Sequence, residues 1–122
     1  MFMDGRVSPR IAAPVSERQV LAAAEIFKTL SDPTRLRILT SLGRGEACVH
    51  ELCARLALSQ TAVSHQLRLL RVGRLVRARQ SGRERVYSLA DEHVMSLVAA
   101  ACSHALEPKA PRTNKPNTKD RR

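Results

Sequence analysis

The segment LSQTAVSHQLRLLRVG, residues 58–73, decides the fold of this chain. Ser59 is a residue type that begins helices, and Gly73 is one that ends them. The apolar residues between them recur at helical spacing and predict one buried side: Val63, Leu67 and Leu70. Another predicted helix, residues 47–56, ends only two or three residues before this one begins. That spacing is typical of a helix-turn-helix motif.

The pattern after Gly73 changes from helical to alternating. The segment LVRARQSGRERVYSL, residues 75–89, places Leu75 and Val86 at apolar positions on either side of a Ser81–Gly82 turn. This predicts a two-stranded hairpin. A helix-turn-helix followed directly by an arginine-rich hairpin predicts a winged helix.

Three more helices are predicted around this centre. The first begins at Ser16, which has the form of a capping box with Gln19. Its apolar residues at helical spacing are Val20, Leu21, Ala24, Phe27 and Leu30. The second follows Asp32 as cap, with an apolar stripe of Leu36, Leu39 and Leu42. The last covers residues 91–107 and ends before Pro108.

The predicted fold class is therefore mainly α with a small β-hairpin, a winged helix-turn-helix. Residues 16–107 form the predicted domain. Residues 1–15 are predicted to be a flexible arm, because they contain one glycine and two prolines. Residues 108–122 are predicted to be a disordered basic tail, because Pro, Lys, Asn and Thr cannot bury a core.

The positive charge of the chain is concentrated in two places. The formal net charge is +10, residues 68–85 carry seven Arg against one Glu, and the tail carries six Lys or Arg against one Asp. Positive charge concentrated in one segment, here residues 68–85, of a domain that is otherwise nearly neutral indicates a nucleic-acid partner. This segment is called the basic stripe. A solubilising surface is the alternative, and it suits the tail better than the stripe. Aromatic residues are only 2%, which argues against stacking on single-stranded nucleic acid.

Several classes of protein are disfavoured by the sequence. We find no signal peptide and no apolar run long enough for a membrane span, so we expect a cytoplasmic protein with reduced thiols and no membrane partner. We also find no nucleophile–base pair and no glycine-rich phosphate loop. An enzyme with a small organic substrate is therefore not expected.

The start of the predicted second helix of the motif carries short polar side chains of the kind that read base edges in double-stranded DNA. These are Ser59, Gln60, Thr61, Ser64 and His65. Gln60 is the best candidate for a bidentate contact with adenine. Arginines further along the helix and in the hairpin are expected to contact phosphates: Arg68, Arg71, Arg77, Arg79, Arg83 and Arg85. The alternative is an ordinary surface helix whose Ser and His side chains only form local hydrogen bonds.

At these residues the sequence resembles the ArsR/SmtB family of metal-responsive winged-helix repressors. LSDPTRLRIL, residues 30–39, resembles the second helix of the family; AVSHQLRLLR, residues 62–71, its recognition helix; and GRERVYSL, residues 82–89, the second strand of the wing. The most specific match is D-x-H-(x10)-H-x-x-E, which resembles the inter-subunit site of the zinc-sensing branch. Its residues here are Asp91, His93, His104 and Glu107.

Helical geometry supports the same division of the site between two chains. His93 and His104 would stand roughly 16 Å apart on nearly the same face of one helix, too far apart to share a metal ion. If two such helices packed antiparallel, Asp91 and His93 of one copy would face His104 and Glu107 of the other. Two-fold symmetry would then create two identical sites. Oxygen and imidazole ligands favour zinc, with cobalt and nickel as alternatives. Helix capping and solvent exposure are the alternative roles for these side chains.

The three cysteines are expected to play no part in metal binding. Some family members carry a further metal site at the third helix, which Cys48 and Glu51 resemble. The N-terminal arm contains no Cys or His, so we expect that second site to be absent. We expect Cys48, Cys53 and Cys102 to pack as small apolar residues.

The resemblance implies a homodimer whose metal-free form binds an inverted-repeat operator and represses transcription. Zinc across the dimer interface is then expected to release the DNA and allow expression of metal efflux or sequestration genes. One alternative is a winged-helix repressor that senses thiol oxidation or another ligand. Another is a basic DNA-packaging protein that is indifferent to sequence.

Overall fold

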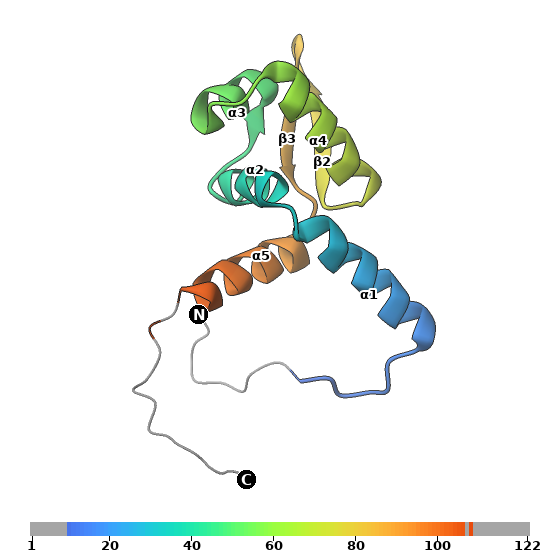
Figure 1. The fold of residues 1–122 in the computed structure, drawn as a ribbon. Helices are drawn as coiled ribbons and strands as arrows, with labels where there is room; N and C mark the ends of the chain where they lie inside the picture. The colour runs from blue at the N-terminus through green and yellow to red at the C-terminus, as the bar shows by residue number, and fades with distance from the viewer. Residues whose placement is uncertain (1–9, 107, 109–122) are drawn as a thin grey trace.

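The computed structural model describes residues 10–106 and 108, and this part of the chain contains five helices and three strands (Figure 1). The helices are α1 (Glu17–Leu30), α2 (Pro33–Gly43), α3 (Val49–Leu56), α4 (Gln60–Val72) and α5 (Glu92–Ala105). The strands are β1 (Ala47–Cys48), β2 (Val76–Ser81) and β3 (Glu84–Leu89). The predicted winged helix-turn-helix is confirmed. The predicted arm is described only from residue 10 and the predicted tail only at Pro108, so both stay predictions.

The sheet is antiparallel, with the strand order β1-β3-β2. The predicted hairpin is present, and Gly82 takes a φ of +63° at its turn, a conformation that glycine adopts without steric cost. The predicted helical start at residue 47 is wrong. Ala47 and Cys48 instead pair with Tyr87 and Val86 as a short strand, and α3 begins only at Val49. Pairing with a distant strand overrides the local helical pattern here.

The core lies where α2, α3 and α4 meet the sheet. Its largest fully buried side chains are Ile38, Leu39, Leu52, Val63, Leu67 and Leu70. The predicted inward positions of α4 are therefore confirmed. In α2 the buried residues are Ile38, Leu39 and Leu42, whereas Leu36 of the predicted stripe is only half-buried. Val94 and Val98 attach α5 to the same core.

Side-chain caps fix the beginnings of four helices. Ser16 and Gln19 form the predicted capping box of α1. Asp32, Ser59 and Asp91 each accept a hydrogen bond from a backbone N–H three residues later, in the first turn of α2, α4 and α5. These bonds satisfy donors that a helix leaves unpaired. The predicted caps at Ser16, Asp32 and Ser59 are confirmed, and Asp91, which was predicted as a metal ligand, also caps α5.

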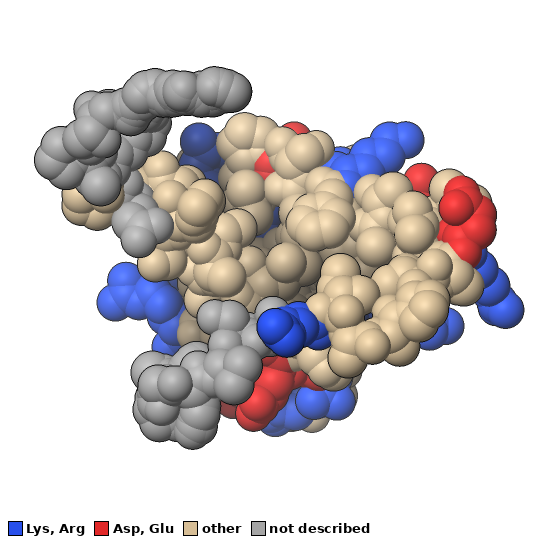
Figure 2. Space-filling model, turned by 90° about the horizontal axis from the view of Figure 1, so that it is seen from below, with Lys and Arg blue, Asp and Glu red and all other residues tan. Residues whose placement is uncertain are grey.

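Helix α1 projects away from the winged helix, next to the end where α5 lies (Figure 1). The sequence predicted apolar residues at helical spacing along this helix. In the single chain only Leu30 is buried, whereas Val20, Leu21 and Phe27 are 47%, 59% and 58% exposed. Seen from this end, most of the molecular surface is uncharged (Figure 2). None of the described helices has the length and apolar character needed to cross a membrane.

Candidate nucleic-acid interface and metal centre

The core of the domain holds α4 so that one side of this helix faces outward. Its apolar side is buried, and the Ser59 hydroxyl accepts the Ala62 N–H at 3.0 Å, which fixes the first turn. All the predicted reading and phosphate-contacting side chains of this segment are exposed: Ser59, Gln60, Thr61, Ser64, His65, Arg68 and Arg71. The polar residues lie at the start of the helix and the arginines further along it. This arrangement suits insertion of the helix start into a major groove.

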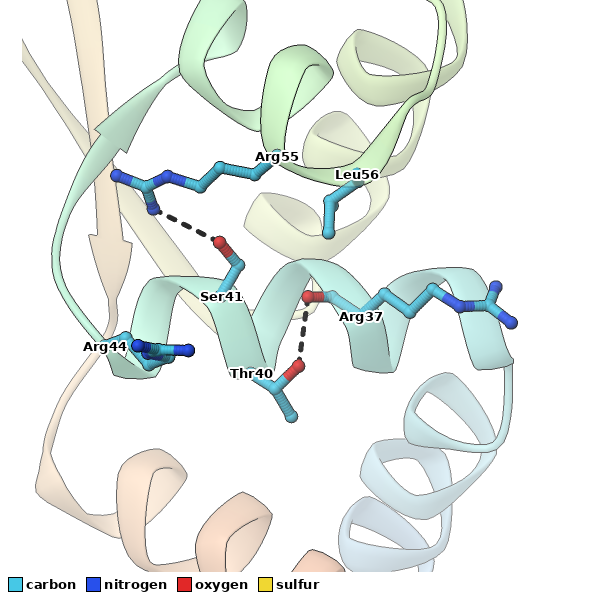
Figure 3. Close-up of a pocket in the computed structure, with 6 residues that line it drawn as sticks. All are labelled: Arg37, Thr40, Ser41, Arg44, Arg55 and Leu56. Carbon is cyan, nitrogen blue, oxygen red and sulfur yellow. Dashed lines mark hydrogen bonds between the residues drawn. The ribbon is translucent and has the colours of Figure 1, made fainter.

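Helix α3 is attached to both of its helical neighbours. A turn through Ala57, in the left-handed conformation with a φ of 55°, connects it to α4. On its other side, the Arg55 guanidinium donates to the Ser41 hydroxyl of α2 at 3.2 Å (Figure 3). This bond crosses a hollow between α2 and α3 that is also lined by Arg37, Thr40, Arg44 and Leu56. The helix-turn-helix is thus fixed on α2 as a unit.

The four arginines of the wing do not form a single stripe. Arg79 pairs with Val86 and Arg77 with Ser88, whereas Arg85 pairs with Gln80. Side chains alternate between the two faces of a strand, so Arg77 and Arg79 lie on one face of the hairpin and Arg85 on the other. Arg83 follows Gly82 at the turn. The hairpin therefore offers positive charge on both faces and at its tip.

Arg79 has a partner that the sequence did not reveal. Its Nη2 lies 2.8 Å from Oε2 of Glu46, and both side chains are about half exposed. Glu46 directly precedes β1, so the pair depends on the strand that was predicted to be helix. The carboxylate neutralises one of the four wing cations in the DNA-free protein.

Asp91 and His93 form a small group at the beginning of α5. One carboxylate oxygen of Asp91 accepts the Val94 N–H at 3.0 Å and lies 3.8 Å from Nδ1 of His93. The side chain of His93 is 99% exposed and that of Asp91 is 56% exposed. Asp91 therefore caps the helix and still presents carboxylate surface beside an accessible imidazole. Such an oxygen and nitrogen pair suits a borderline divalent metal.

The other two predicted ligands are His104 and Glu107. His104 is in the last turn and exposed, and Glu107 lies outside the described residues. Among residues 10–106 and 108, no three His, Cys, Asp or Glu side chains come close enough to hold a metal ion. The described part of a single chain thus places Asp91 and His93 together and His104 apart from them.

A hollow adjoins Asp91 and His93 where α1, α4 and α5 meet. Ile26 and Thr29 of α1 and Leu69 and Val72 at the end of α4 line it, together with Arg35, Val94 and other residues. The lining is mainly apolar. Asp91 and His93, the possible ligands at the start of α5, therefore lie at the edge of this hollow.

Cys48 and Glu51 contact each other at the start of α3. Oε1 of Glu51 accepts the backbone N–H of Cys48 at 2.9 Å. This backbone hydrogen bond is the main reason that the pKa of Glu51 is lowered. The hydrogen bond with the Cys48 side chain and the nearby positive charge of Arg55 lower this pKa further. The carboxylate is thus engaged in holding the start of α3. Cys48 is buried and Cys53 half-buried, but the expected packing of Cys102 is wrong, because this residue is exposed.

Comparisons with known proteins agree with this geometry. The family model described as "Bacterial regulatory protein, arsR family" matches residues 32–78. A transcriptional repressor SmtB homologue from Synechocystis is 46% identical over 102 residues, which cover 84% of this chain and 75% of that protein. A homologue of the cadmium-resistance regulatory protein CadC from Staphylococcus aureus is 36% identical, covering 80% and 82% of the two chains.

The fold comparison gives a similar result. The solution structure of a homodimeric winged helix-turn-helix DNA-binding domain from Mycobacterium bovis matches with a TM-score of 0.70 and 30% identity. The match covers 84% of this chain and 97% of that one. The similarity therefore extends well beyond the helix-turn-helix.

Proposed function

Because this chain belongs to the ArsR/SmtB family of DNA-binding transcriptional repressors, we propose that it is a metal-responsive repressor that binds its operator as a homodimer. The metal-free dimer binds an inverted repeat, and zinc bound at α5 lowers its affinity for DNA. Expression of metal efflux or sequestration genes follows. Members of this family are not enzymes.

The observation that carries the proposal is the position of possible ligands at both ends of α5. Asp91 and His93 stand together and accessible at its start, and His104 stands in its last turn. Two ligands from one copy and two from a second copy, His104 and Glu107, complete a set of four. The S. aureus relative, named for cadmium resistance, supports a metal as the signal.

The donor set fits zinc, with cobalt and nickel as alternatives, because imidazole and carboxylate suit these ions and no thiolate is included. Bound zinc would supply a tetrahedral link between two α5 helices. The chain's own contribution is to hold the ligands in place. The Val94 N–H fixes the Asp91 carboxylate, and the start of α5 is anchored in the core by Val94.

The exposed apolar side of α1 supports dimerisation through the α1 and α5 end of the molecule. Val20, Leu21 and Phe27 of α1 and Met95 of α5 are large apolar residues that a single chain leaves open. Contacts with a second copy would cover them, and the M. bovis neighbour is a homodimer. A two-fold axis at this end would also bring the start of one α5 towards the end of the other.

Replacing Gln60 tests which part of α4 reads sequence. Gln60→Ala is expected to lower operator affinity by about 1–3 kcal/mol and to leave affinity for random duplex unchanged, because a bidentate base contact is lost. Arg68→Ala is the matched comparison, since it should weaken binding to both duplexes. Fluorescence anisotropy with the two duplexes at one salt concentration measures this. Equal losses on both duplexes for Gln60→Ala would place base reading elsewhere.

The first test of the proposed function is operator binding by the wild-type protein with and without zinc. We expect zinc to weaken operator binding by about 5- to 150-fold, the usual range of coupling between two sites. Fluorescence anisotropy measures it, with random duplex as the control for sequence-indifferent binding. Equal operator affinities with and without zinc would contradict metal release. Equal affinities for operator and random duplex would instead indicate DNA packaging.

The exposure of Cys102 favours one alternative signal, oxidation of a thiol on α5. Cys102→Ser distinguishes it in the same assay. A variant that keeps the full zinc response and no longer responds to peroxide assigns the thiol a separate role. A variant that loses the zinc response would place the thiol in the metal signal.

A further inference from the structure

Arg35 of α2 forms hydrogen bonds with two other helices at once. Its Nη1 donates to the backbone oxygen of Thr29 in the last turn of α1 at 3.1 Å. Its Nε donates to Oε1 of Gln66 in α4 at 3.0 Å. The backbone N–H of Arg35 donates to the Asp32 carboxylate at 2.9 Å, which fixes the backbone position from which the Arg35 side chain extends. One half-buried residue therefore joins α1, α2 and α4.

Both acceptors of Arg35 matter for the placement of their helices. The carbonyl of Thr29 is one of the last four in α1, which have no partner within the helix. Gln66 is half-buried and lies away from the exposed reading side chains of α4. A planar guanidinium holds two acceptors in a fixed relative direction, which a flexible ammonium group does not do. A shift of α1 relative to α4 would strain at least one of these bonds.

Arg35 also borders the hollow at the start of α5. The lining of this hollow includes Arg35 and Thr29 together with Asp91 and His93. The residue thus lies between the apolar end of the molecule and the helix that carries the reading side chains. Within the described residues, helix α1 packs on the core near its end, through Ile26 and Leu30, and the bond from Arg35 to Thr29 adds a polar contact at that attachment.

We propose that Arg35 is a positioning residue that fixes the recognition helix α4 relative to α1, so that a change in the α1 and α5 end reaches the DNA-reading side chains. The inference rests on the proposed function for the role of zinc. The positioning of α4 for operator reading does not depend on any metal. The two parts can therefore be tested separately.

The test uses Arg35→Met and Gln66→Leu, which remove the bond between α2 and α4 from either side. Arg37→Met is the matched control, because it removes the same charge from the same helix. Arg37 is exposed, and within the described residues its side chain has no hydrogen bond or ion pair to lose (Figure 3). Full-length metal-free variants are compared in anisotropy assays on operator and random duplex, with thermal unfolding and dimer mass as controls for folding.

We expect Arg35→Met and Gln66→Leu each to lower the ratio of operator to random affinity roughly 10-fold, the effect of losing a hydrogen bond to a charged group. The double variant should lose little more than Arg35→Met alone, because Arg35→Met already removes the bond to Gln66. Arg37→Met should keep the wild-type ratio. Unchanged ratios in the two test variants, or an equal fall in Arg37→Met, would overturn the positioning role. Should Arg35→Met fail to fold, Gln66→Leu decides.

Repeating the assay with zinc tests the transmission step. We expect the zinc-induced loss of operator affinity to shrink in Arg35→Met and Gln66→Leu but not in Arg37→Met, while zinc affinity is retained. A full zinc effect in both test variants would overturn transmission through Arg35. If the wild type itself shows no zinc effect, the proposed metal response is wrong. The ratios of operator to random affinity measured without zinc still test the positioning role of Arg35.

Discussion

A heterodimer of one His93→Ala chain and one His104→Ala chain is expected to regain the zinc response that each variant lacks as a homodimer. In each homodimer, both sites lack one imidazole ligand. In the heterodimer, one site lacks two ligands, but the other combines the intact Asp91 and His93 of one chain with the intact His104 and Glu107 of the other. About one tight zinc per dimer should return, compared with about two in the wild type.

The effect on the homodimers should be large. Removing an outer hydrogen-bond partner of a ligand already costs roughly 10- to 100-fold in metal affinity, and removing the ligand itself should cost more. Co-expression with two different affinity tags and purification through both isolates the heterodimer. Zinc titration and operator anisotropy then measure stoichiometry and response.

The control is a heterodimer of His93→Ala with the double variant His93→Ala/His104→Ala, in which neither site can be complete. It should stay unresponsive. If the wild type responds to zinc and the heterodimer of His93→Ala and His104→Ala does not, the result would contradict a metal site divided between the ends of two α5 helices.

Leu70→Ala is expected to destabilise the fold by about 2–5 kcal/mol, because it leaves a cavity in a packed core. Leu70 is fully buried on the inward side of α4, where α4 packs against α2, α3 and the sheet. For a domain of this size each kcal/mol corresponds to a fall in Tm of roughly 4–8 °C. Urea or thermal unfolding of metal-free protein at one fixed protein concentration measures the change, since dimerisation makes stability concentration-dependent.

Val72→Ala is the matched comparison on the same helix. Val72 is 78% exposed, so its truncation should change the free energy of unfolding by less than about 0.5 kcal/mol. A loss of several kcal/mol from Val72→Ala and none from Leu70→Ala would mean that α4 turns its other side to the core. The exposed reading side of α4 would then be wrongly assigned.

The features predicted from the sequence are those specified by neighbouring residues. Ser59, the apolar positions of α4 and Gly73 all act within a few residues of one another, and α4 forms where they indicate. The caps at Ser16 and Asp32 are equally local. The hairpin turn at Gly82 requires only a glycine between two alternating segments.

The features that the sequence did not reveal depend on contacts between distant segments. Strand β1 forms because β3, about forty residues later, offers an unpaired edge. The partners of Arg35 in α1 and α4 likewise become visible only when three helices are assembled. Periodicity showed that α1 has an apolar side, but not that this side is left open in one chain. The metal ligands keep the status of a prediction, because Glu107 lies outside the described residues and a second chain is needed.

The ion pair between Glu46 and Arg79 has a consequence for how tightly the protein binds to DNA of any sequence. A cation that already has its own carboxylate adds little to the neutralisation of phosphates unless the pair opens, and opening it leaves an anion facing the duplex. On the proposed mode of DNA binding, the wing should enter the ionic-strength dependence mainly through Arg77, Arg83 and Arg85, which have no ion pair within the described residues. Fewer condensed cations should then be displaced from random duplex, and binding to it should be weaker than with four unpaired wing arginines.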